Sequence, residues 1–99
     1  MIIVTGTVKI RPEMREAAIE RGLWMSRLTE QEPGCRSYRF YADLADPATF
    51  LVFEVWESDE ALRAHFGTPH MAEFSRVLAG LVANPPVVTR YEVIAAGTL

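Results

Sequence analysis

The segment from Phe50 to Trp56 constrains the fold most, because it is a strand-length run that is apolar on both faces. Alternate positions fall into two sets, with Leu51, Phe53 and Val55 on one face and Phe50, Val52 and Trp56 on the other; Glu54 alone interrupts them. A sheet that is covered by helices on one side buries only one of these sets. Leaving the second set in water would cost several kcal/mol at ~25 cal/mol per Å². The run therefore predicts that a second copy of the chain covers the other face, as in a homodimer or a higher oligomer.

Hydrophobic periodicity places four strands and two helical regions along the chain. Alternating apolar residues predict strands at 2–10, 35–42, 50–56 and 87–94, whereas a helical period runs over 13–32 and from 58 to the stop at Asn84-Pro85-Pro86. We expect Gly67-Thr68-Pro69 to break the second helical region. The short connector at 43–47 makes the central strands an antiparallel hairpin. The order β-α-β-β-α-β predicts an α+β, ferredoxin-like arrangement with a four-stranded antiparallel sheet.

Length and composition exclude several classes of protein. Ninety-nine residues, 49% of them hydrophobic, are enough for a single domain over 1–99 with a core at about 2–94. A net charge of −3 with scattered cations gives no basic face for nucleic acid. No apolar run is long enough to span a membrane and no signal peptide is apparent, so we expect a cytoplasmic protein. A single cysteine, Cys35, excludes an internal disulfide.

Three segments carry a resemblance to a known family. Glu32-Pro33-Gly34-Cys35-Arg36-Ser37-Tyr38 resembles the E-P-G-C-x-x-Y segment of antibiotic biosynthesis monooxygenase (ABM) domains, including the quinol monooxygenase-like group. Phe53-Glu54-Val55-Trp56-Glu57-Ser58 and the run from Ala61 to Met71 resemble later family segments, in the same order and at similar spacing. The similarity covers about residues 2–94.

This resemblance implies a fold and a range of activities. It implies a dimeric α+β barrel, in which two ferredoxin-like units pair their sheets, in agreement with the two-faced strand. The family includes cofactor-independent oxygenases of aromatic polyketides, quinol monooxygenase-like proteins, haem-degrading members and an isomerase-like group. The haem-degrading branch uses an Asn in the first strand, where this chain has Gly6-Thr7, so that activity is not expected.

His65 is the candidate catalytic base. It lies on the predicted inward face of the second helical region, and its side chain titrates near neutral pH, which suits removal of a phenolic proton. The alternative is a core histidine that is hydrogen-bonded to a backbone carbonyl or to Glu54. His70 either gates the pocket, caps a helix or lies in solvent. Because His65 and His70 are five residues apart, rather than three or four, we expect no metal site.

Four further residues are candidates for substrate binding. Trp56, Trp24 and Phe66 could hold a planar ring, although packing in the core is the alternative for each. Arg21 is unexpected because it lies within the apolar stripe of the first helix, formed by Met14, Ala17, Ala18, Met25 and Leu28. An unpaired cation there must pair with an acid, reach solvent or contact an anionic ligand.

The predicted function is that of a cofactor-independent monooxygenase. Its expected substrates are O2 and a small electron-rich aromatic, quinol-like or polyketide-derived compound, which itself supplies the electrons. No phosphate-binding glycine-rich loop is present, so no tightly held nucleotide cofactor is predicted. A non-catalytic dimeric binding module and a cofactor-free isomerase that uses the same histidine remain as alternatives. The site assigned to His65 and Trp56 requires both side chains to line one enclosed cavity; if both are packed solid, that site is abandoned.

Overall fold

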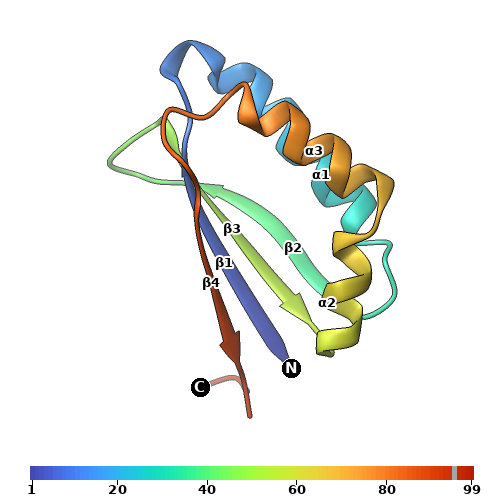
Figure 1. The fold of residues 1–99 in the computed structure, drawn as a ribbon. Coiled ribbons are helices and arrows are strands. Elements are labelled where there is room, and N and C mark those ends of the chain that lie inside the picture. The colour runs from blue at the N-terminus through green and yellow to red at the C-terminus, as the bar shows by residue number, and fades with distance from the viewer. Residues whose placement is uncertain (95) are drawn as a thin grey trace.

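The structure is a computed structural model that describes residues 1–94 and 96–99. Four strands, one 3-10 turn and three helices follow one another along the chain (Figure 1). Their bounds are β1 Ile2–Lys9, η1 Pro12–Met14, α1 Arg15–Thr29, β2 Cys35–Ala42, β3 Thr49–Trp56, α2 Asp59–Phe66, α3 Pro69–Ala79 and β4 Val87–Glu92. None of these helices has both the length and the apolar character needed to cross a bilayer.

The strands form one antiparallel sheet in the order β2-β3-β1-β4. The hairpin of β2 and β3 lies on one side of β1, and β4 pairs with the other side of β1 after the crossover through α2 and α3. This topology confirms the ferredoxin-like α+β prediction. The strand ends differ slightly from the expected ones: β4 stops at Glu92, and Ile10 forms an isolated bridge with Val82 after β1 has ended.

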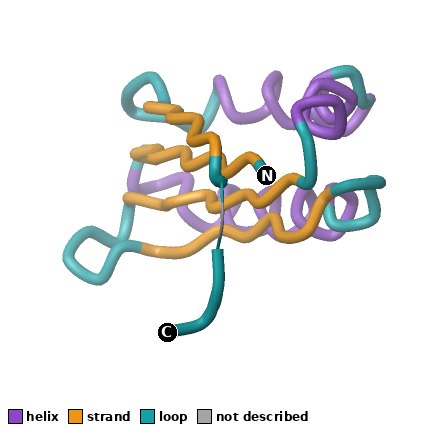
Figure 2. Tube along the Cα trace, turned by 90° about the horizontal axis from the view of Figure 1, so that it is seen from below, coloured by secondary structure: helices purple, strands orange, loops and turns teal. Residues whose placement is uncertain are grey.

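Helices cover one face of the sheet and leave the other bare. In Figure 1, α1 and α3 lie side by side over one face with α2 below them, and Figure 2 shows the four strands as a separate layer. The register pairs Ile2 with Trp56 and Val4 with Glu54 on the helix side. The opposite side, here called the open face, carries Ile3, Thr5, Leu51, Phe53, Val55 and Tyr91. The prediction that β3 is apolar on both faces is confirmed.

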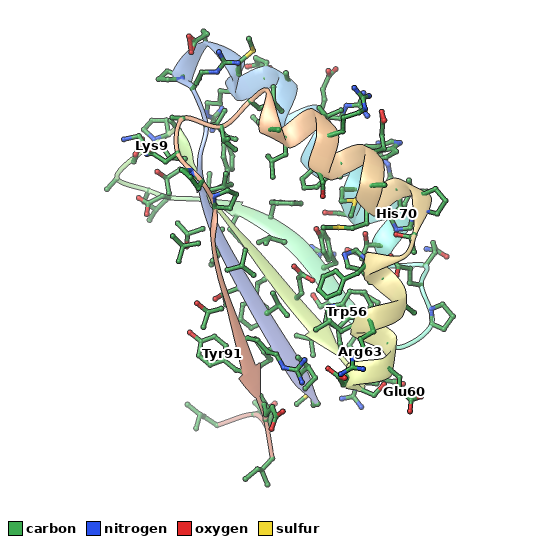
Figure 3. All side chains as sticks on the ribbon, viewed as in Figure 1. Lys9, Trp56, Glu60, Arg63, His70 and Tyr91 are labelled. Atoms are coloured by element: carbon green, nitrogen blue, oxygen red, sulfur yellow. The ribbon has the colours of Figure 1, made fainter. Side chains whose placement is uncertain are left out.

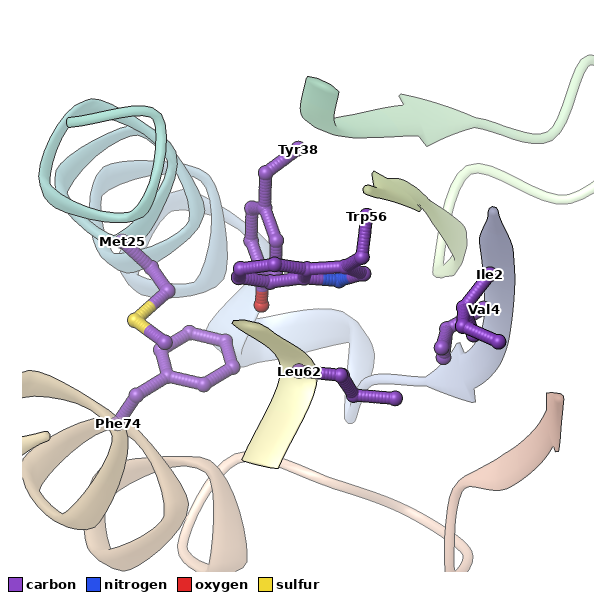
Figure 4. Close-up of a cluster of buried hydrophobic side chains, with 7 residues drawn as sticks. All are labelled: Ile2, Val4, Met25, Tyr38, Trp56, Leu62 and Phe74. Carbon is purple, nitrogen blue, oxygen red and sulfur yellow. The ribbon is translucent and has the colours of Figure 1, made fainter. Parts of the chain in front are cut away.

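The core lies between the helices and the helix-facing side of the sheet. Trp56 is fully buried at its centre, with Tyr38 on one side and Leu62 on the other (Figure 4). A second buried cluster, formed by Val8, Ile10, Phe50 and Leu81, fills the opposite end of the same layer. The two clusters position α1, α2 and α3 over the sheet.

The predicted break between α2 and α3 is confirmed, and two local caps explain it. The side chain of Ser58 accepts a hydrogen bond from the backbone N–H of Ala61, which begins α2. Thr68 accepts a hydrogen bond from the N–H of Met71 and Pro69 follows it, which begins α3. The second helical region therefore consists of two helices that present their side chains in different directions.

The predicted inward face of α1 was wrong at its C-terminal end. Gly22, Met25 and Thr29 are buried, whereas Leu28 is 39% exposed. The helix turns Gly22 toward the sheet because this position touches the ring of Phe40: a Cβ there would lie 3.2 Å from Cδ2 of the ring. The helix is also shorter than expected, since residues 12–14 form a 3-10 turn and α1 ends at Thr29.

Candidate functional site

Two imidazoles and one carboxylate converge where α1, α2 and α3 come together. Nδ1 of His65 lies 2.8 Å from Oε2 of Glu32, and Nε2 of His70 lies 2.6 Å from the same oxygen. These three side chains are called the Glu32 cluster below. The expectation that five residues keep the two histidines apart was wrong, because the break at Thr68 places them on different helices.

Backbone hydrogen bonds fix the segments that carry the cluster. The N–H of Glu32 donates to the carbonyl of Thr29, and the carbonyl of Glu32 accepts from Cys35, so the turn after α1 holds the carboxylate in place. The hydroxyl of Thr68 donates to the carbonyl of His65 at 2.8 Å, which fixes the angle between α2 and α3.

The cluster is largely shielded from solvent. His65 is 1% exposed, and the side chain of His70 is 16% exposed. The ring of His65 packs against Trp56, with 4.9 Å between the centroids, and against Tyr38 at 5.6 Å. Burial lowers the pKa of His65, and the hydrogen bond to Glu32 opposes this effect. The predicted alternatives for His65 named Glu54 or a backbone carbonyl as its partner, whereas the side-chain partner is Glu32.

A second buried carboxylate lies beside this cluster on β3. The indole Nε1–H of Trp56 donates to Oε1 of Glu54 at 3.0 Å. The pKa of Glu54 is raised to about 7, chiefly by burial; the indole hydrogen bond opposes this rise, and the charge of Glu32 adds to it. Burial likewise raises the pKa of Tyr38, which pairs with Glu54 across β2 and β3. Neutral forms of these groups are therefore favoured in this part of the core.

A cavity of about 530 Å³ lies between α1 and the sheet, beside α3. It is called the α1 cavity below. Its lining combines aromatic and aliphatic side chains, among them Phe40, Phe50, Phe74, Ile10, Ile19 and Leu78. Four guanidinium groups also belong to the lining, from Arg15, Arg21, Arg27 and Arg39, whereas Glu30 is the one acid among the described residues that line it. Apolar walls with an excess of positive charge suit a planar anion.

Arg21 packs on an aromatic ring of its own helix, α1. Its guanidinium carbon lies 5.3 Å from the ring centroid of Trp24, and the side chain is half-buried. Within the described residues, Arg21 has no carboxylate oxygen within 4.0 Å. Of the three alternatives for Arg21, pairing with an internal acid is therefore not found among these residues, although its charge contributes to lowering the pKa of Glu73.

The structure does not bring the predicted site residues together. Arg21 lines the α1 cavity, whereas Trp24, His65 and Trp56 line neither it nor the shallower hollow near Pro85. His70 belongs to the Glu32 cluster, so its expected capping or solvent-exposed role was wrong. Phe66 is 60% exposed, so its expected place in an enclosed pocket was also wrong.

Figure 3 shows Trp56 and His70 on the helix-covered side of the sheet, and Tyr91 on the other. Sequence reasoning missed Glu32 as a site residue, although it is the first residue of the segment 32–38 that carries the family resemblance. It also missed the aromatic walls of the cavity, since nothing in the sequence showed that Phe40, Phe50 and Phe74 surround one space.

Comparison with known proteins identifies the family. The family model described as antibiotic biosynthesis monooxygenase matches residues 1–77. The chain belongs to the antibiotic biosynthesis monooxygenase family. The Synechocystis protein sll1783, whose function is uncharacterised, is 37% identical over 98 residues, which cover 99% of this chain and 67% of that protein. The Mycobacterium tuberculosis protein Rv0793, which carries the name of a monooxygenase, is 35% identical over 79 residues, covering 80% of this chain and 77% of the relative.

Solved structures of the family have the same fold. A Deinococcus radiodurans structure described as an antibiotic biosynthesis monooxygenase superposes with a TM-score of 0.93 at 28% identity, covering 100% of this chain and 98% of its own. The structure of Rv0793 superposes with a TM-score of 0.91 at 28% identity, covering 98% of both chains. Family membership and these monooxygenase names support a monooxygenase-like function.

Proposed function

We propose that this chain is a cofactor-independent monooxygenase that oxidises a small electron-rich aromatic compound, quinol-like or polyketide-derived, in the α1 cavity. The observation that carries the proposal is the lining of that cavity, in which phenyl rings from the sheet and from α3 adjoin four guanidinium groups. Membership of the antibiotic biosynthesis monooxygenase family supports the reaction type.

The cationic lining suits the first step of such a reaction. A positive charge near a phenol favours its ionised form and lowers its pKa. Arg21, which has no acidic partner among the described residues, is the residue that we assign to the phenolate. His65 was the base expected from the sequence. Because it does not line the cavity, we assign proton loss to the lowered pKa of the bound substrate.

The remaining steps need no reductant other than the substrate. The phenolate transfers one electron to O2, and the resulting substrate radical and superoxide combine to form a C–O bond. The peroxide anion takes up the proton that the phenol lost, and the hydroperoxide then loses water, so that the carbon that gained oxygen gives up its hydrogen and becomes a carbonyl while the second oxygen atom leaves as H2O. The aromatic and aliphatic walls of the cavity would limit the contact of the radical pair with water.

Oxygen uptake with a panel of hydroquinones and anthrones tests the proposal. Wild-type protein should consume O2, and Arg21→Gln should lower kcat/KM about tenfold to a hundredfold, because a hydrogen bond to a charged group contributes ~1.5–3 kcal/mol. Arg63→Gln is the control, since Arg63 is exposed on α2 and pairs with Asp59. Equal rates for wild type and Arg21→Gln would exclude the assigned role.

The same assay separates the two alternative functions. Product formation without O2 uptake would indicate a cofactor-free isomerase. Saturable binding of the aromatic compounds with neither uptake nor product would indicate a non-catalytic binding module. Either result would overturn the monooxygenase proposal.

We also propose that two chains pair through their open faces. The central strand contributes Leu51, Phe53 and Val55 to this face, and no helix of the described chain covers them. Burial of these side chains against an identical set would remove apolar surface from water at ~25 cal/mol per Å². The α1 cavity lies on the other side of the sheet, so each chain would keep its own cavity.

A further inference from the structure

We propose that the Glu32 cluster is a binding site for one divalent transition ion of the Zn²⁺ class. The proposed oxidation in the α1 cavity uses none of its three side chains, so this proposal does not depend on that one. The ion would contact Nδ1 of His65, Nε2 of His70 and a carboxylate oxygen of Glu32.

The three donor atoms lie close together. Each of them lies within 4.8 Å of the other two, and both imidazole nitrogens are directed at one oxygen of Glu32. Tetrahedral coordination at ~2.0–2.1 Å sets neighbouring donor atoms about 3.3 Å apart. The oxygen of Glu32 lies 2.8 and 2.6 Å from the two nitrogens, so these contacts must lengthen for an ion to enter between the three side chains.

The donor set selects the kind of ion. Imidazole nitrogen suits zinc, copper, iron and nickel, whereas calcium and magnesium prefer sites made only of oxygen ligands. Two histidines and one carboxylate, with a fourth position left for water or another ligand, form a common zinc arrangement. Zn²⁺ is therefore the probe that this site fits best.

The charge around the cluster also favours a cation. No Lys or Arg nitrogen of the described residues lies within 4.0 Å of the Glu32 carboxylate; its ion-pair partners there are the two imidazoles. An ion at this position would compensate negative charge that burial otherwise makes costly.

Binding would connect three separate segments of the chain. Glu32 lies in the turn between α1 and β2, His65 near the end of α2, and His70 in the first turn of α3. A ligand that binds only the folded chain stabilises it. Zn²⁺ should therefore raise the melting temperature, and the increase should depend on all three side chains.

Untagged, chelator-treated full-length protein provides the test. Equilibrium dialysis against ZnCl2, with metal analysis of the protein, should give one Zn²⁺ per chain. Isothermal titration should show affinity at least tenfold weaker in His70→Gln and in Glu32→Gln, each of which retains a polar side chain. Circular dichroism of each variant confirms that it folds. Glu57→Gln is the matched control, because Glu57 is an exposed acid that pairs with Arg36 at the end of β3.

Two results would overturn the proposal. If wild-type protein retains no more Zn²⁺ after dialysis than His70→Gln does, the site does not exist. Undiminished binding and an undiminished rise in melting temperature in both His70→Gln and Glu32→Gln would place the ion elsewhere. Tetrahedral Co²⁺ absorption bands in wild type that disappear in both variants but persist in Glu57→Gln would support it.

Discussion

At the scale of single residues, Glu54 links burial to the effect of pH on stability. Its pKa is raised from 4.5 to about 7, so the folded protein holds this proton more tightly than the unfolded chain does. The free energy of unfolding should therefore fall as pH rises through this interval. Glu54→Gln keeps a hydrogen-bond acceptor for the indole N–H of Trp56 and removes the titratable carboxyl group. Relative to wild type, the variant should gain about 2 kcal/mol of stability between pH 5 and pH 8 in urea unfolding experiments.

Glu57→Gln provides the control for this titration, since it removes an exposed carboxylate on the same strand end. Its stability difference from wild type should change little over the same pH interval. If the difference between Glu54→Gln and wild type also stays constant from pH 5 to pH 8, Glu54 is already ionised in the folded protein at pH 5.

Individual side chains show what the sequence could and could not predict about the candidate site. The inward direction of His65 followed from the helical period of Ala61, Leu62 and Phe66, and it is confirmed by the burial of His65. Its partner Glu32 lies 33 residues earlier in the sequence, in a turn. Hydrophobic periodicity within a helix gives no information about contacts with a turn so far away in the sequence. Contacts of this kind depend on tertiary packing, which places the two segments together.

At the scale of the elements, the turn from α1 to β2 depends on Gly34. This residue has φ +81°, and a Cβ at this position would lie 2.5 Å from Cβ of Ala61 on α2. Gly34→Ala should therefore lower the free energy of unfolding by roughly 2–4 kcal/mol, through backbone strain and displacement of α2. Gly67→Ala is the control, because its Cβ would meet only the carbonyl of Ala64 at 3.5 Å. Comparable stability losses in the two variants would contradict this explanation.

The elements themselves were largely predictable, because local signals specify them. Alternation of apolar and polar residues predicted all four strands, and Thr68-Pro69 marked the boundary between α2 and α3. The inward face of α1 was predicted less well, since hydrophobicity favoured Leu28 over its neighbour Thr29. Close approach of Gly22 to Phe40 sets the rotation of the helix and buries Thr29 instead. The pattern of apolar residues in the sequence does not indicate this contact.

At the scale of the whole molecule, the open face determines how the chain associates. Phe53→Asp places a charge in the middle of this face and should shift the mass measured by sedimentation equilibrium from two chains to one. Leu44→Asp is the control, because Leu44 is fully exposed in the loop between β2 and β3. A wild-type mass of one chain at micromolar concentration, or an unchanged dimer mass in Phe53→Asp, would exclude pairing through this face.

The alternation of β3 has a consequence for how such a chain can change over evolutionary time. Val52 pairs with Gly6 toward the helices, whereas its neighbour Phe53 pairs with Thr5 toward the open face. Substitutions can therefore alter one surface of the strand and leave the other unchanged. A single inserted residue would instead exchange the two sets of side chains beyond it. We therefore expect insertions and deletions in related sequences to occur in the 43–48 loop, whereas β3 should differ among them only by substitutions.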